Sequence, residues 1–137
     1  MPRRIFVCGS LRKGELNHDR FEGFGDILVA TGTVARAVLK DLGTYPAMIP
    51  SANDNDRVVG EVFEISDALG EVLDRFEREE GYEARPVIVN VTGDHPSLIQ
   101  AEAYFFSAPD RITAKPTVEG GDWATHDHVR PAPRGKV

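Results

Sequence analysis

Short apolar runs bounded by glycine and proline dominate this chain and constrain its fold more than any other feature. The runs are rich in β-branched and aromatic residues, which favour strands, and the residues between them favour turns. We expect strands at residues 3–8, 27–30, 33–39, 57–65, 86–91 and 98–106, with Thr31-Gly32 separating the second from the third. The pattern therefore predicts a fold rich in β-structure.

One segment shows helical periodicity instead. Ser66 is a suitable N-cap, and apolar residues follow at i, i+3, i+4 and i+7, namely Leu69, Val72, Leu73 and Phe76. This helix is expected to end near Gly81, and a short helix is expected at 16–21 within the polar segment 12–25. Five or six strands with one clear helix after the fourth predict an α+β fold, a small mixed β-barrel or curled sheet.

The length of 137 residues is typical of one domain, so we expect a single domain over 1–137. The segment from Pro109 onward is rich in proline and glycine. We expect it to lie over the surface, with a flexible tail at 131–137.

Charge and cysteine content narrow the function classes. The net charge is −6 and the basic residues are scattered, which argues against nucleic acid and anionic membranes as partners. Cys8 is the only cysteine, so an internal disulfide is impossible, and the apolar run that contains it is too short for a signal peptide or a membrane span. We expect a cytoplasmic protein; its oligomeric state is open.

Two kinds of chemistry find little support. The close pair His126 and His128 has neither a cysteine nor an i+4 partner, so no metal site is expected. Ser10, His18 and Asp19 lack the strand, sharp turn and helix that surround a hydrolase serine.

Two other features are better candidates. Gly9-Ser10-Leu11 follows a predicted buried strand, where a glycine turn can direct backbone N–H groups toward an anion. On these residues alone, however, a plain strand-ending turn is the favoured interpretation. Glu77, Glu79 and Glu80 close the predicted helix. Glu77 lies on the flank of the apolar stripe, but Glu80 is also near it, so periodicity leaves the choice between them open.

Several blocks, in order, give the chain a family resemblance. They are the opening segment 6–14 with Asn17-His18, then Leu42-Gly43-Thr44-Tyr45-Pro46-Ala47, Gly60-Glu61-Val62-Phe63, Leu73-Asp74-Arg75-Phe76-Glu77 and Gly121-Asp122-Trp123. The chain resembles the γ-glutamylcyclotransferase-like family, which includes γ-glutamylamine cyclotransferase and AIG2-like proteins. The resemblance implies a small mixed β-barrel with flanking helices and a cavity at one end.

The resemblance also implies a reaction and its residues. The substrate's own α-amine would displace the amide of a small γ-glutamyl compound and release 5-oxoproline, with no cofactor. Glu77 matches the general base, Cys8, Gly9, Ser10 and Leu11 match the substrate-binding loop, and Arg85 matches an arginine eight residues after the base. Cys8 stands where the family loop has tyrosine, and it is expected to be an inert thiol.

Two alternatives to an enzyme are open. The same fold can serve as a module that binds a small carboxylate ligand without turning it over, since some relatives lack the base. A structural or partner-binding domain is the other alternative, and it predicts no pocket that joins Glu77 to the glycine turn. The amine on the far side of the scissile bond is not specified by the sequence.

Overall fold

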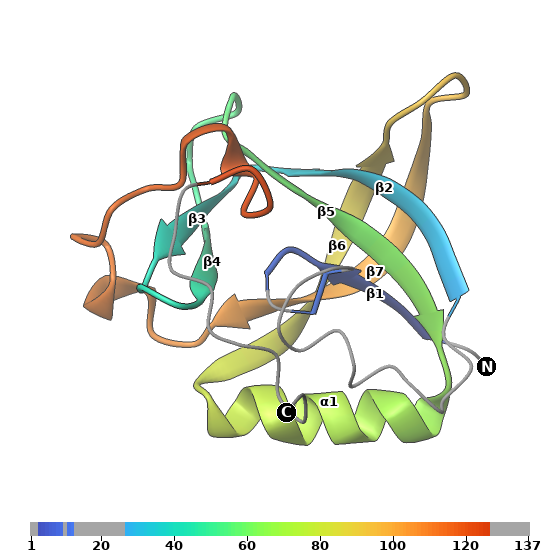
Figure 1. Ribbon diagram of the computed structural model, residues 1–137, viewed down its shortest axis with the longest axis horizontal. Coiled ribbons are helices and arrows are strands. Elements are labelled where there is room, and N and C mark those ends of the chain that lie inside the picture. Colours follow the sequence, from blue (N-terminus) through green and yellow to red (C-terminus); the bar gives the residue numbers. More distant parts are fainter. Residues whose placement is uncertain (1–2, 10, 13–26, 127–137) are drawn as a thin grey trace, which may run out of the picture.

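The structure, a computed structural model, describes residues 3–9, 11–12 and 27–126 (Figure 1). In these residues the strands are β1 (Arg3–Val7), β2 (Ile27–Ala35), β3 (Ala37–Asp41), β4 (Pro46–Pro50), β5 (Arg57–Ile65), β6 (Tyr82–Val91) and β7 (Ser97–Phe106). The helices are α1 (Asp67–Glu79) and the short 3₁₀ segments η2 (Pro109–Arg111) and η3 (Glu119–Gly121). The helix expected at 16–21 and the tail at 131–137 lie outside the described residues.

Five strands close into a barrel in the order β1-β5-β2-β6-β7. β1 completes it by pairing parallel to β7 and antiparallel to β5, while the remaining barrel pairs are antiparallel. β3 and β4 form a separate two-stranded sheet, and α1 lies below the barrel strands in Figure 1. The predicted α+β fold with a small mixed barrel is confirmed.

Two apolar clusters occupy opposite sides of the barrel wall. The first fills the barrel and includes Phe6, Val58, Val62 and Trp123. The second lies between the wall and α1, and consists of Ile5, Val7, Leu11, Phe63, Ile65, Leu69, Leu73 and Tyr104. β5 therefore has buried residues on both faces. The face that carries Phe63 and Ile65 also contains the buried carboxylate of Glu61, and Val59 on that face is partly exposed.

The helix α1 begins where the sequence predicts. Ser66 is the N-cap, and its hydroxyl accepts a hydrogen bond from the Leu69 amide at 3.1 Å. The helix ends at Glu79, and Gly81 takes a positive φ of 94° just beyond it. Val72 does not belong to the buried stripe, since it is 44% exposed. The buried side is rotated from the expected stripe toward Gly70, which packs against Arg3.

The division of β2 and β3 differs from the prediction. The chain continues as one strand through Thr31-Gly32 and breaks at Arg36, which has a φ of 58°. Gly32 is needed for a close approach and not for a turn, because a Cβ there would overlap the Asn90 carbonyl oxygen of β6. β4 was not predicted. It begins and ends with proline, a residue that argues against a strand in sequence-based assignment.

Residues 109–126 contribute to the core and are not only a surface covering, which corrects the sequence prediction for this part of the segment. Val118 and Trp123 are 2% and 1% exposed within the barrel cluster, and Ile112 packs against β4 residues Ala47 and Ile49. Val118 also donates a backbone hydrogen bond to Leu39 of β3. These apolar residues are too widely spaced to form a periodic pattern, so the sequence alone does not reveal their burial.

Candidate functional site

The turn after β1 packs against both the barrel and α1. The Arg12 amide donates a hydrogen bond to the Gly9 carbonyl at 3.0 Å, which closes the turn. Leu11 is 4% exposed and belongs to the same apolar cluster as Leu73 of α1. A Cβ on Gly9 would lie 2.7 Å from Cγ of Pro46, so glycine permits this close packing. Ser10 lies outside the described residues.

Glu77 lies near the C-terminal end of α1. It is half-buried, whereas Glu79 and Glu80 are exposed. The pKa values of Cys8 and Tyr82 are both raised. Burial is the largest cause, and the negative charge of Glu77 is the second. The Glu77 carboxylate therefore lies near the end of β1 and the start of β6.

Cys8 is held as a neutral thiol. Burial and the nearby Glu77 carboxylate raise its pKa to about 12, while the Arg12 charge acts in the opposite direction. The residue packs against the apolar cluster inside the barrel. A thiolate, the reactive form of cysteine, is disfavoured at this position.

Tyr82 was not singled out from the sequence, yet its phenol is near Glu77. Its hydroxyl donates to the Pro46 carbonyl at 3.0 Å, and its ring meets Phe106 edge to face at 5.5 Å. Burial and then the Glu77 charge raise the pKa of Tyr82, so the phenol remains protonated at neutral pH. The position of Tyr82 immediately after the helix that carries Glu77 was the available signal.

Arg85 lies on β6 with its guanidinium half exposed. It donates hydrogen bonds to Glu83 at 2.7 and 3.2 Å, and its guanidinium carbon is 5.4 Å from the centroid of the Phe105 ring. Since side chains alternate along a strand, Arg85 and Tyr82 project from opposite faces of β6. The assignment of Arg85 to substrate binding stays a prediction.

A buried ionic cluster lies beside the turn. Arg12 donates to Glu61 at 3.2 Å and to Asp122 at 2.7 Å. Burial opposes the Arg12 charge, but the hydrogen bond to Asp122 and the charge of Glu61 raise its pKa, so it is ionised. The sequence places Arg12 in a polar segment, and no local pattern connects it with Glu61 and Asp122.

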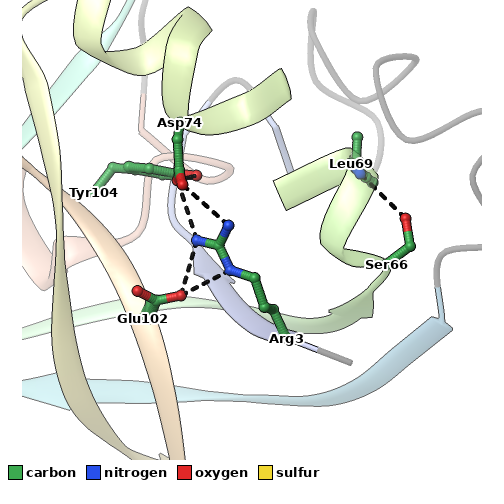
Figure 2. Close-up of polar contacts among 6 residues, drawn as sticks. All are labelled: Arg3, Ser66, Leu69, Asp74, Glu102 and Tyr104. Atoms are coloured by element: carbon green, nitrogen blue, oxygen red, sulfur yellow. Dashed lines mark hydrogen bonds and ion pairs between the residues drawn. The ribbon is translucent and has the colours of Figure 1, made fainter. Parts of the chain in front are cut away.

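A second ionic network holds α1 against the barrel (Figure 2). Arg3 of β1 donates two hydrogen bonds to Asp74 of α1, at 3.0 and 3.1 Å, and one to Glu102 of β7 at 2.9 Å. Tyr104 donates a further hydrogen bond to Asp74 at 2.7 Å. Asp74 lies three residues before Glu77, so these bonds fix the helix turn next to the candidate base.

Neither a metal centre nor a membrane span is found in the part of the chain that the structure describes. Over 3–9, 11–12 and 27–126, no three His, Cys, Asp or Glu residues are grouped so that they could hold a metal ion. Over the same ranges, no helix has both the length and the apolar character to cross a membrane.

The chain belongs to the gamma-glutamyl cyclotransferase, AIG2-like family, whose family model matches residues 5–125. The match confirms the resemblance seen in the sequence blocks, all five of which contribute residues to the turn, to Glu77 or to their surroundings. No curated protein is a significant match in sequence.

Solved structures share the fold. An AIG2-like protein from Mus musculus has a TM-score of 0.78 at 20% identity, over 99% of both chains. YkqA from Bacillus subtilis has a TM-score of 0.71 at 26% identity, but the alignment covers 90% of this chain and 40% of YkqA. An uncharacterised protein from Pyrococcus horikoshii has a TM-score of 0.66 at 21% identity, over 88% of this chain and 89% of its own.

Proposed function

We propose that the chain is an active γ-glutamyl cyclotransferase, which releases 5-oxoproline and a free amine from a small γ-glutamyl amide. The observation that carries the proposal is the half-buried Glu77 carboxylate, close enough to the turn to raise the pKa of Cys8. Family membership supplies the class of reaction. The cytoplasm is the proposed location.

The substrate supplies its own nucleophile. The α-amine attacks the γ-carbonyl carbon, a C–N bond forms to close a five-membered ring, and the C–N bond to the departing amine breaks. Holding the two groups in the reactive geometry can contribute about 7–11 kcal/mol toward the barrier. The proposed enzyme therefore has to bind, orient and move a proton, and it needs no cofactor.

Glu77 is the proposed proton carrier. A free α-amine has a pKa of about 8, so most of the substrate arrives as an ammonium that has no lone pair for attack. The Glu77 carboxylate accepts the ammonium proton and then delivers it to the departing amine, so the carboxylate is regenerated. General acid–base catalysis of this kind contributes roughly 10²–10⁴ in rate.

The turn is the proposed binding site for the negatively charged groups of the substrate. Backbone amides of Gly9, Ser10 and Leu11 bind the substrate carboxylate or the developing oxyanion, and Arg85 contributes its guanidinium to the carboxylate. Cys8 fills the position of the loop tyrosine and contributes shape, since its thiol is not ionised. A smaller side chain at this position favours a different leaving amine from that of tyrosine-containing relatives.

The proposal is tested with a panel of γ-glutamyl amines, amino acids and peptides, with 5-oxoproline release as the readout. Glu77→Gln keeps the side chain's size but cannot accept a proton, so we expect turnover to fall at least about 10²-fold, mainly in kcat. Glu79→Gln and Glu80→Gln are matched controls, because both residues are exposed on the same helix end.

The outcomes separate the enzyme from its alternatives. Binding of a γ-glutamyl compound without any 5-oxoproline release by the parent protein would favour a non-catalytic binding module. Parent-like turnover by Glu77→Gln would remove Glu77 from the mechanism, and loss of turnover in either control instead would assign the base to that glutamate.

A further inference from the structure

The cluster of Arg12, Glu61 and Asp122 joins three parts of the chain that are distant in sequence. Arg12 follows the turn, Glu61 is in β5, and Asp122 follows η3, at separations of 49 and 110 residues from Arg12. The side chains of Arg12 and Glu61 are 10% and 11% exposed, and that of Asp122 is 26% exposed. Each of the three residues belongs to a different block of the family resemblance.

Close backbone packing brings the two carboxylates to Arg12. Gly60 precedes Glu61, and a Cβ on Gly60 would overlap the Val7 carbonyl oxygen of β1. Gly121 precedes Asp122, and a Cβ there would overlap the Arg57 carbonyl oxygen of β5. Gly121 also has a φ of 66°, which favours glycine. Both carboxylates are therefore held by backbone contacts that a larger residue would disrupt.

Arg12 connects these fixed carboxylates to the turn. Its own amide closes the turn by donating to the Gly9 carbonyl at 3.0 Å. Its guanidinium uses Nε for Glu61 and Nη1 for Asp122. A planar guanidinium that is bound at two of its nitrogens has a defined orientation, which a flexible ammonium lacks. Arg12 is therefore anchored at both ends, by its guanidinium to the two carboxylates and by its amide to the turn.

Stability alone is a weak explanation for such a cluster. Replacing buried ion pairs by apolar residues of similar volume is often neutral or stabilising, because desolvation offsets the Coulomb attraction. Geometric specification is the better-supported role where, as here, the charges fix a loop. This inference rests on the proposed cyclotransferase function: we propose that Arg12 is a positioning residue that fixes the backbone amides of Gly9 and Leu11 for binding the γ-glutamyl group beside Glu77.

The test measures binding separately from turnover. Arg12→Lys keeps the charge, but a single ammonium nitrogen cannot reproduce the hydrogen bonds that two guanidinium nitrogens donate to Glu61 and Asp122. In the Glu77→Gln background, where turnover is expected to be at least about 10²-fold slower, we expect Arg12→Lys to raise the Kd of a γ-glutamyl amide by roughly 10–100-fold, since small misplacements of a binding group have effects of this size. In the parent background, kcat/KM should fall by a similar factor while the pH profile of kcat keeps its shape, because Glu77 remains the base.

Asp122→Asn is the second variant and covers the case in which Arg12→Lys does not fold. It keeps an acceptor for Arg12 and removes only the charge, so a smaller loss of binding is expected. Arg36→Lys is the control for the substitution itself, because Arg36 pairs at 3.4 Å with Asp54 on the exposed surface. Thermal unfolding of each variant is recorded, and assays are run well below the lowest Tm.

Unchanged Kd in folded Arg12→Lys or Asp122→Asn overturns the positioning role, as does a loss that disappears when the assay temperature is lowered. Failure of the proposed function looks different. In that case the parent protein binds or converts no γ-glutamyl compound, and the present inference, which depends on it, is contradicted together with it.

Discussion

At the scale of single residues, burial near the turn raises the pKa of one thiol and two phenols. Cys8, Tyr82 and Tyr104 each have a raised pKa, with desolvation as the largest cause and the Glu77 charge as a contributor. All three therefore remain protonated at neutral pH. This arrangement fits the proposal that a carboxylate, Glu77, carries the proton during turnover, with thiol and phenol groups as neutral neighbours.

The raised pKa of Cys8 predicts slow chemical labelling. With a pKa of about 12, native Cys8 has a far smaller thiolate fraction at pH 8 than an unperturbed thiol with a pKa near about 8.5. We expect the native protein to react at least about 100-fold more slowly with a thiol reagent than the same chain in denaturant. Stopped-flow labelling at pH 8 measures both rates, and equal rates would contradict the raised pKa of Cys8.

At the scale of secondary-structure elements, α1 is held by ionic contacts as well as by its apolar face. Arg3 reaches Asp74 beneath Gly70, where a Cβ would overlap the Arg3 guanidinium. Partial burial of Asp74 opposes its ionisation, but hydrogen bonds from Arg3 and Tyr104 dominate and lower the pKa of its carboxyl. The ionised form of Asp74 is therefore favoured by folding.

Asp74→Asn should destabilise the fold at neutral pH by about 1.5–3 kcal/mol, since it weakens hydrogen bonds to a charged group. Because the folded-state pKa of Asp74 is below its ordinary value, its contribution to stability is present above about pH 4 and is lost as the pH falls further. Urea unfolding at pH 7 and pH 3 should show a smaller difference between variant and parent at pH 3.

The control for this substitution is Asp54→Asn, since the Asp54 side chain is 81% exposed in the loop before β5. We expect it to change the free energy of unfolding by less than about 0.5 kcal/mol at either pH. An effect of Asp74→Asn that is equal at pH 7 and pH 3 would show that the charge of Asp74 is not what stabilises α1.

The sequence predicts elements well where local signals are complete. Strand Arg57–Ile65 and the Ser66 N-cap were predicted with their observed positions, because a β-branched run, a turn and a capping residue follow one another directly. Glycines were harder to interpret. Gly32 permits close strand packing and does not form the predicted break between strands, and a glycine in the sequence is compatible with either role.

For the candidate site, the resemblance suggested Glu77 and the turn but not the groups that hold them. Arg12, Glu61 and Asp122 are joined only by the tertiary fold, and no local pattern connects residues so far apart. Tyr82 was likewise missed, because its contact with Pro46 depends on the placement of β4, which was itself not predicted.

At the scale of the whole molecule, the segment after β7 completes the core. Trp123, the chain's only tryptophan, is 1% exposed within the barrel cluster, and its ring stacks on that of His126 at 5.6 Å. His126 also contacts Asp41, at the end of β3, at 3.0 Å. These contacts make the C-terminal part of the described chain a component of the barrel's interior.

Trp123→Ala should therefore destabilise the fold by about 3–5 kcal/mol, the range for emptying a buried aromatic site. Circular dichroism in urea is the measurement, because the substitution removes the fluorescent residue. Leu98→Ala is the control, since Leu98 is 69% exposed and should change stability by less than about 0.5 kcal/mol. Similar urea midpoints for the two variants would mean that the segment after β7 does not contribute to the stability of the barrel core.

The parallel pairing of β1 with β7 has a consequence for synthesis of the chain. Arg3 and Glu102 hydrogen-bond across a separation of 99 residues, so the first strand has no partner on that edge until nearly the whole described chain has been translated. Until then β1 can pair only with β5, and its other edge is exposed. Nascent chains stalled before β7 should consequently bind chaperones that recognise unpaired strands, and release them once Phe106 has left the ribosome.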